Sequence, residues 1–169
     1  MQHYNINLNN IKNGGEIYSF QINDSFFKEF LSSEITKADF NIHLDIKKEN
    51  DKYLLCLQIK GVIKNLVCDL CAEELNIPIQ NTTTIILQES KEILESTDEI
   101  IYIKPHQNII NLKSLFFEII SLSVPSKRIH KTDTKGDSEC NNDMLKLIEK
   151  YMRKEVAYDD RWETLKNLK

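Results

Sequence analysis

Two neighbouring segments, residues 40–46 and 53–59, place an apolar side chain at every second position. This period of two is typical of a β-strand with one buried face. The polar stretch KENDK between the segments predicts the turn of an antiparallel hairpin. The side chains expected on its buried face are Phe40, Ile42, Leu44, Ile46, Tyr53, Leu55, Leu57 and Ile59.

The chain that follows the hairpin continues to favour strands. The run from residue 65 to 90 predicts a strand, a tight knuckle and more strand, with the strongest β propensity at residues 82–87. Residues 99–104 predict another strand, after an acidic segment expected to loop out. Gly61 is expected at a bend or bulge, and Pro78 at a sheet edge or bulge, because proline has no N–H to donate.

Helical periodicity appears in four places. A short helix is predicted over about residues 25–33, capped by Asp24, and a stronger one over 112–123, capped by Asn111. A third is expected over about 142–154. A fourth is expected in the tail from residue 157, where Asp160 and Glu163 have capping-box spacing. The stripe expected to be buried on the second helix is Leu112, Leu115, Phe116, Ile119 and Ile120.

Together these segments predict an α+β fold: an antiparallel β-sheet or partly closed barrel with a few packed helices and a helical C-terminal tail. The chain has 169 residues, with 41% hydrophobic and 28% charged. This length fits one domain with an appended tail. We expect an α+β core domain over residues 1–140 and a C-terminal helical extension over 141–169.

Composition also bears on compartment and partners. No apolar run approaches the roughly 20 residues of a membrane helix, and the first residues lack the features of a secretory signal. We therefore expect a cytoplasmic protein that does not bind a membrane. The formal net charge of −4 weighs against non-specific nucleic-acid binding, although it leaves room for a local basic patch.

Two of the four cysteines, Cys68 and Cys71, form a C-x-x-C motif in the stretch NLVCDLCAEEL. A tight turn with this spacing puts two sulfurs close enough to share a tetrahedral metal ion or a disulfide. His130 and Cys140 lie about ten residues apart in one polar loop and are the candidates for two further ligands. The four residues predict a closed Cys3His site for structural zinc.

Two alternatives stay open for this motif. Short knuckles usually bring ligands closer together than the spacing of His130 and Cys140, so reduced, metal-free thiols are one alternative. A redox dithiol is the other, but its usual setting is a helix N-terminus in a βαβ unit. The acidic neighbours Asp69, Glu73 and Glu74 are also expected to raise a thiol pKa. Cys56, in a predicted strand, is expected to be buried and inert.

No catalytic signature accompanies these residues. The chain has no phosphate-binding glycine loop, nucleophile elbow or H-E-x-x-H motif. Two acidic pairs, Asp98 with Glu99 and Asp159 with Asp160, fit a solvated strand start and a helix cap better than acid–base catalysts. We therefore expect no enzymatic activity and no small-molecule substrate.

The order of the motifs resembles the YceD family, the large ribosomal RNA subunit accumulation proteins, and in particular its Bacteroidetes-type members. The knuckle C-D-L-C is followed by Asp98-Glu99 and a strand, then by the segment from Leu112 to Pro125. Arg128, His130 and Cys140 come next, and the terminal D-R-W-x-x-L-x-x-L closes the series. Two knuckle positions depart from the pattern, with Leu70 in place of the usual arginine and Ala72 in place of leucine.

The resemblance implies a non-catalytic ribosome-biogenesis factor that supports 23S rRNA accumulation and large-subunit assembly. Its expected partners are rRNA or ribosome-assembly proteins, contacted through the C-terminal helices. The basic residues expected there are Lys146, Lys150, Arg153, Lys154, Arg161, Lys166 and Lys169. An alternative is a small zinc-stabilised adaptor that binds protein and makes no RNA contact. The alternative for the lysines is a solvated face interleaved with glutamates.

Overall fold

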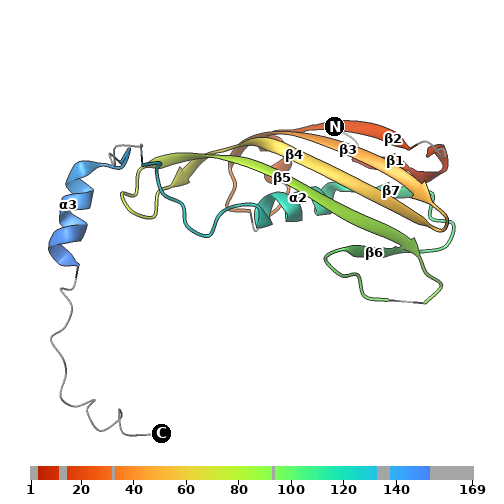
Figure 1. The fold of residues 1–169 in the computed structure, drawn as a ribbon. Coiled ribbons are helices and arrows are strands. Elements are labelled where there is room, and N and C mark those ends of the chain that lie inside the picture. The colour runs from red at the N-terminus through yellow and green to blue at the C-terminus, as the bar shows by residue number, and fades with distance from the viewer. Residues whose placement is uncertain (1–3, 12–14, 32, 93, 133–137, 153–169) are drawn as a thin grey trace, which may run out of the picture. The chain divides into compact units, whose positions relative to one another are not determined.

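The structure is a computed structural model that describes residues 4–11, 15–31, 33–92, 94–132 and 138–152 (Figure 1). The chain forms two compact units. Unit 1 contains residues 1–67 and 74–128, and unit 2 contains residues 68–73 and 129–169. The knuckle therefore groups with the C-terminal part of the chain. The boundary at residue 140 expected from the sequence stays a prediction.

Unit 1 is built on a five-stranded sheet in the order β2-β3-β4-β5-β6, with a separate two-stranded sheet of β1 and β7. The strands are β1 (Asn5–Asn7), β2 (Glu16–Ile22), β3 (Lys37–Glu49), β4 (Lys52–Val67), β5 (Glu74–Glu89), β6 (Ile100–Ile103) and β7 (Ile109–Asn111). The helices of this unit are η1 (Leu8–Asn10), α1 (Asp24–Phe27) and α2 (Lys113–Leu122).

The predicted hairpin is confirmed as β3 and β4, which pair antiparallel from Glu49 opposite Lys52 to Lys37 opposite Lys64. The alternating apolar side chains face one side, and Phe40, Leu44 and Leu57 are fully buried there. The other side carries polar residues such as Asn41 and Gln58, which are exposed. The period of two in the sequence thus determined both the strand pair and its buried face.

The other face of this core comes from α2, which the sequence predicted, and from β1 and β7, which it did not. In Figure 1, α2 and β7 lie beneath the sheet, on its buried side. Phe116 of α2 is fully buried, with its ring centroid 5.1 Å from that of Phe20 and 6.0 Å from that of Tyr4. Strand β1 holds the N-terminal segment against β7 by pairing Asn5 with Asn111. These aromatic contacts join the N-terminal segment, β2 and α2 in one core.

The sheet departs from the expected architecture in two ways. It is mixed, because β6 runs parallel to β5 and pairs with it over Ile86–Glu89. It is also open in the described part of the chain, with β2 and β6 at opposite edges and no pairing that closes a barrel. The parallel pairing is possible because residues 90–99 carry the chain back before β6 begins, whereas a tight hairpin turn would have made β6 antiparallel to β5.

The first predicted helix is shorter than expected. Helix α1 ends at Phe27, and Leu31, which falls within the predicted range, is fully exposed. Its cap is Asn23, whose Oδ1 accepts a hydrogen bond from Ser25 N at 3.2 Å. Asp24, the predicted cap, instead accepts a hydrogen bond from Ala38 N at 2.8 Å. Asp24 therefore fastens the helix to the start of β3.

The second predicted helix is confirmed as α2. It starts at Lys113, and Asn111 Oδ1 accepts a hydrogen bond from Lys113 N at 2.9 Å, one residue before the cap position taken by Leu112. Within the predicted stripe, Leu115 is half-buried. The other four residues of the stripe are buried, namely Leu112, Phe116, Ile119 and Ile120.

The two residues predicted at irregular or edge positions of the sheet, Gly61 and Pro78, have different structural roles. Gly61 pairs in register with Phe40 and with Ile79, so it marks no bulge; the irregularity lies between Ile63 and Leu66. A Cβ atom at Gly61 would lie 2.2 Å from Asp39 O, which explains the glycine by close strand approach. Pro78 lies in β5 where the strand has no neighbour on its second side, as expected.

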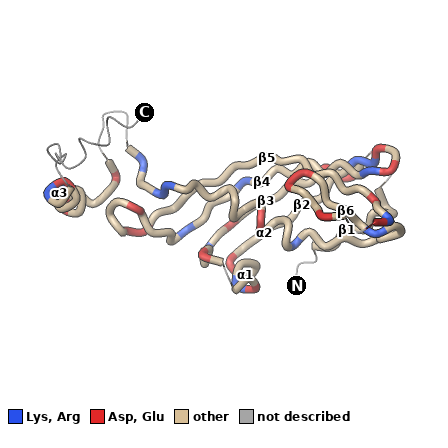
Figure 2. The backbone as a smooth tube through the Cα atoms, turned by 90° about the horizontal axis from the view of Figure 1, so that it is seen from below, with Lys and Arg blue, Asp and Glu red and all other residues tan. Residues whose placement is uncertain are grey.

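Unit 2 contains one described helix, α3 (Asn142–Tyr151), which confirms the third predicted helix up to Tyr151. Its side chains Met144, Leu145 and Ile148 are half-buried, whereas Tyr151 is exposed. Figure 2 shows basic and acidic residues together on α3. The predicted tail helix with Asp160 and Glu163 lies outside the described residues. No helix in the described part of the chain is both long enough and apolar enough to span a membrane.

Candidate metal centre

The four residues predicted as metal ligands come together in unit 2. The ligand atoms of Cys68, Cys71, His130 and Cys140 all lie within 4.8 Å of one another. The three cysteines are buried and His130 is half-buried. Residues separated by up to 72 positions in the chain are thus within reach of a single ion.

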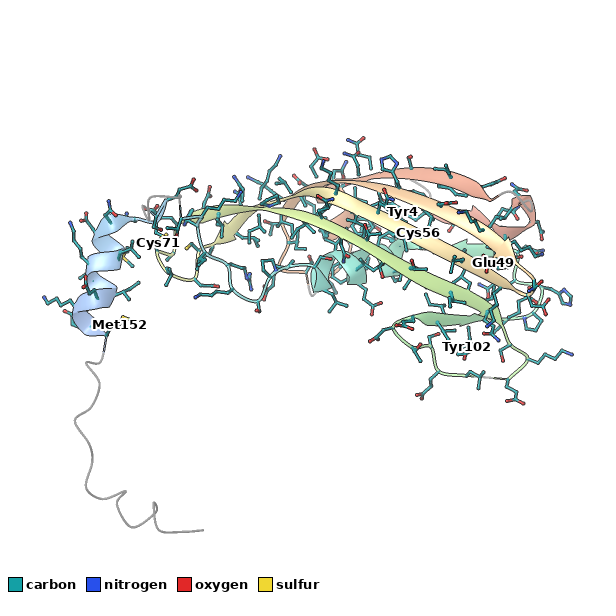
Figure 3. All side chains as sticks on the ribbon, viewed as in Figure 1. Tyr4, Glu49, Cys56, Cys71, Tyr102 and Met152 are labelled. Atoms are coloured by element: carbon teal, nitrogen blue, oxygen red, sulfur yellow. The ribbon has the colours of Figure 1, made fainter. Side chains whose placement is uncertain are left out.

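The first pair of ligands lies in the turn that joins β4 to β5, where Figure 3 labels Cys71. Cys68 N donates to Glu73 O at 2.9 Å, and Ala72 N donates to Cys68 O at 3.0 Å. Ala72 has a φ of 59°, in the left-handed region, which reverses the chain directly after the motif. The turn therefore holds both sulfurs on one side, as the C-x-x-C spacing predicted.

The second pair is brought together by a short strand-like contact. Glu139 N donates to Lys131 O at 3.1 Å, and Thr132 forms an antiparallel bridge with Ser138. In this antiparallel pairing His130, two residues before Thr132, lies beside Cys140, two residues after Ser138. The Cys140 Sγ to His130 Nδ1 distance is 3.6 Å. Backbone pairing therefore brings His130 and Cys140 together although ten residues separate them in the chain.

Three separations between the ligand atoms are close to those around a tetrahedral zinc ion. Zinc with Zn–S bonds of about 2.3 Å and a Zn–N bond of about 2.0 Å separates two sulfurs by about 3.8 Å and a sulfur from a nitrogen by about 3.6 Å. Here Cys68 Sγ and Cys140 Sγ are 3.8 Å apart. Cys71 Sγ lies 3.4 Å from His130 Nδ1. The residues present fit the size and the donor preference of zinc.

The Cys68 thiol is adapted to carry a negative charge. Burial raises its pKa, but hydrogen bonds from the backbone of Cys71, Leu70 and His130 and from the Cys71 side chain outweigh burial and lower the pKa to about 6. The expectation that acidic neighbours raise the thiol pKa is therefore wrong at Cys68. The backbone N–H groups of the turn contact the sulfur, while Asp69 and Glu73 are exposed to solvent.

Cys140 behaves differently. The Ser138 hydroxyl lowers its pKa, but burial and the neighbouring thiols of Cys68 and Cys71 outweigh this, so that the pKa is raised. Within the metal-free cluster one thiol ionises readily while its neighbour retains its proton. A divalent ion would remove this difference, because it favours the thiolate at every cysteine ligand.

Two residues of this centre were missed at the sequence level. Ser138 Oγ accepts a hydrogen bond from Cys140 N at 3.1 Å, and Asn141 Nδ2 donates to Glu73 Oε1 at 2.7 Å. Asn141 also caps α3, since its Oδ1 accepts from Asp143 N at 2.9 Å. It therefore links the helix start to the knuckle. Two patterns in the sequence could have indicated these residues: Ser138 lies two residues before Cys140, as in a serine turn, and Asn141 directly precedes a predicted helix, as a capping residue does.

The remaining cysteine and two other histidines lie elsewhere. Cys56 lies in β4 between Asp45 and Thr84, and is half-buried rather than fully buried as expected (Figure 3). His43 Nδ1 is 3.0 Å from Ser19 Oγ on the exposed face of the sheet. His106 is exposed in a turn with a φ of 63°. His3 lies outside the described residues.

This arrangement supplies four protein ligands, which is the closed coordination typical of structural rather than catalytic zinc.

The comparisons with known proteins agree with the motif order. The family model described as large ribosomal RNA subunit accumulation protein YceD matches residues 55–169, a range that includes all four cluster residues. No curated protein and no solved structure matches the chain.

Proposed function

Because the chain belongs to the YceD family, the large ribosomal RNA subunit accumulation proteins, we propose that it is a cytoplasmic, non-catalytic factor that supports 23S rRNA accumulation and large-subunit assembly. The match over residues 55–169 is the observation that carries this proposal. It covers most of β4, all of β5, α2 and the Cys3His cluster.

Zinc is the second part of the proposal. Cys68, Cys71, His130 and Cys140 hold one structural zinc ion, supported by their mutual distances and by the low pKa of the Cys68 thiol. When bound, the ion fastens the β4–β5 turn to the segment that leads into α3. None of the described residues of α3 is buried, so the ligands and Asn141 are the main described constraints on this part of unit 2.

The C-terminal segment is proposed to contact rRNA or an assembly protein. Its described lysines, Lys146 and Lys150, alternate with the acidic residues Asp143 and Glu149. Lys146 Nζ lies 3.6 Å from Asp143 Oδ1, so part of its charge is compensated within the helix. The other basic residues expected in this surface, Arg153, Lys154, Arg161, Lys166 and Lys169, lie outside the described residues.

The decisive test is depletion of the protein in its own cells, followed by the ratio of 23S to 16S rRNA and a sucrose-gradient ribosome profile. We expect a selective fall in 23S rRNA and in 50S particles, with 16S rRNA and 30S particles maintained. Re-expression of the wild-type chain should restore both. An unchanged ratio and profile would contradict a role in large-subunit assembly.

A second candidate is a zinc-stabilised adaptor that binds protein without touching RNA, and it is favoured by the closed Cys3His cluster. Ultraviolet crosslinking of RNA to the protein in growing cells separates the two candidates. The ribosomal proposal in its direct form predicts crosslinked 23S rRNA fragments. Absence of RNA crosslinks, together with a stable protein complex that contains zinc, would favour the adaptor.

The zinc proposal has its own test in Cys71→Ser, with Cys56→Ser as the matched control outside the cluster. We expect purified wild-type protein to contain one zinc ion per chain by elemental analysis. Cys71→Ser should weaken zinc binding by more than about 100-fold and lower the melting temperature, because one of the ligands is lost. Full zinc content and unchanged stability in Cys71→Ser would contradict the site.

A further inference from the structure

Strand β5 leaves most of one edge without a partner strand. It pairs with β4 from Glu74 to Gln88, but with β6 only over Ile86–Glu89. Residues 74–85 therefore have a neighbour on one side only within the described part of the chain. An unpaired edge of this length offers a row of backbone donors and acceptors to an extended peptide.

The direction of these backbone groups follows from the pairing at the end of the strand. Ile86 N donates to Glu99 O at 2.8 Å, so Ile86 points its backbone groups away from β4. Because N–H groups alternate along a strand, Gln80, Thr82 and Thr84 point the same way. None of their N–H groups makes a hydrogen bond to any described residue. Pro78 shares this direction, where its missing N–H disturbs no pairing.

A groove runs along this edge. It has a volume of about 560 Å³ and lies between β5, residues 96–98 and helix α2. The strand contributes Asn81, Thr83 and Ile85 to its lining. These residues alternate along β5 with Gln80, Thr82 and Thr84, whose backbone groups point outward. Its apolar part is lined by Ile85, Ile101, Leu115, Ile119 and Leu122. Leu122 is 78% exposed, a large apolar side chain with little cover from described residues.

The charge of the groove has one sign. Asp98, in the loop before β6, and Glu118, on α2, both line it, and no lysine or arginine among the described residues does. The remaining lining residues are asparagine, serine, threonine and apolar side chains. A segment that pairs with the edge therefore meets hydroxyl and apolar groups along the groove and negative charge at two points.

We propose that this edge is a strand-addition site for a lysine- or arginine-containing extended segment of a partner protein. The segment pairs with the backbone of Gln80, Thr82 and Thr84 and extends the sheet. Every second side chain enters the groove, where apolar residues contact Leu115 and Ile119 and basic residues approach Asp98 and Glu118. The backbone supplies affinity, and the groove supplies selectivity for basic sequences.

The test is selection of random peptides of about ten residues, displayed on phage, against the full chain. We expect enrichment of sequences in which lysine or arginine alternates with apolar residues. Asp98→Lys combined with Glu118→Lys should weaken binding of an enriched peptide about tenfold or more. The control, Asp39→Lys with Glu49→Lys, makes the same change in net charge outside the groove and should leave binding unchanged within about twofold.

Two further measurements separate strand addition from charge attraction alone. Thr82→Pro removes one outward N–H and should abolish binding, as long as its circular dichroism spectrum matches the wild type. Hydrogen exchange of Gln80, Thr82 and Thr84 should slow when the peptide is added. If Thr82→Pro does not fold, the hydrogen-exchange rates of the three amides and the binding of the charge variants distinguish strand addition from charge attraction.

Several outcomes would overturn the proposal. They are no enriched peptide, enriched peptides without basic residues, or binding that survives the groove variants. Slow exchange of the three amides in the free chain would also overturn it, since a segment of the chain itself would then occupy the edge. The outcome does not depend on the rRNA measurements, because the peptide selection uses purified protein.

Discussion

Ala72 takes a left-handed backbone conformation that side chains other than glycine and asparagine rarely adopt, with a φ of 59°. The same turn places the N–H groups of Leu70 and Cys71 against the Cys68 sulfur. This backbone angle reverses the chain directly after Cys71, where Cys68 N donates a hydrogen bond to Glu73 O. The chemistry of the cluster thus depends on local backbone geometry as much as on the cysteines themselves.

The Cys68 thiol leads to a prediction about pH. In metal-free protein its pKa is lowered from 9.0 to about 6. A group with a lower pKa in the folded state adds stability that is complete above the unfolded pKa and is lost as pH falls through the folded pKa. Ultraviolet absorbance of the thiolate should therefore show a transition near pH 6 that is missing in Cys68→Ser and retained in Cys56→Ser. No transition below pH 8 in the wild type would contradict it.

Gly61 leads to a prediction about stability. A Cβ atom there would lie 2.2 Å from Asp39 O and 2.4 Å from Phe40 Cδ1, inside any normal contact distance. Gly61→Ala should therefore push β3 and β4 apart and reduce the free energy of unfolding by about 1–3 kcal/mol. The neighbouring half-buried residue is the control, and Val62→Ala should cost less than about 1 kcal/mol. Equal effects in denaturant titrations would argue against close strand approach.

At the level of elements, helix α2 determines how the sheet is covered. It contributes Phe116, Ile119 and Ile120 to the core and leaves Leu122 exposed. Asn81 Nδ2 donates to Ser123 Oγ at 2.6 Å, which fixes the end of the helix to β5. The helix therefore has one face packed under the sheet and one side along the β5 groove.

The core role of α2 predicts a large effect at Phe116. Its ring is fully buried and contacts Phe20 and Tyr4. Phe116→Ala should cost about 3–5 kcal/mol, from lost apolar contact and from the cavity left behind. On the same helix, Leu122→Ala should change stability by less than about 0.5 kcal/mol, because that side chain is exposed. Thermal and denaturant unfolding measure both.

At the level of the whole molecule, the chain consists of two units with different sources of stability. Unit 1 has the large apolar core of the sheet and α2. Unit 2 has the Cys3His cluster, and no described residue of α3 is buried. Figure 3 labels Met152 after the end of α3, where its side chain is 69% exposed. We infer that the two units respond differently to loss of metal.

Chelation therefore predicts local rather than global unfolding. Removal of zinc should increase hydrogen exchange of residues 138–151, while amides at the centre of β3 and β4 stay protected. The expected circular dichroism change is a loss of helix with the β signal retained. Added zinc should restore the protection. Equal loss of protection in both units, or no loss in unit 2, would contradict this division.

Elements whose residue pattern is local could be predicted from the amino-acid sequence. The period of two in residues 40–59 predicted β3 and β4, and helical spacing predicted α2 and α3, because side-chain direction repeats along each element. The C-x-x-C spacing likewise predicted two converging sulfurs. His130 and Cys140 were predicted as metal ligands from their residue types and their position in one polar loop.

Contacts between distant segments could not be predicted in this way and were found in the folded chain. The parallel pairing of β6, the junction of β1 with β7 and the unpaired edge of β5 depend on chain crossing, which no local period encodes. The proximity of His130 to Cys140 depends on backbone pairing between Lys131 and Glu139. The low pKa of Cys68 depends on N–H groups that converge only in the folded turn.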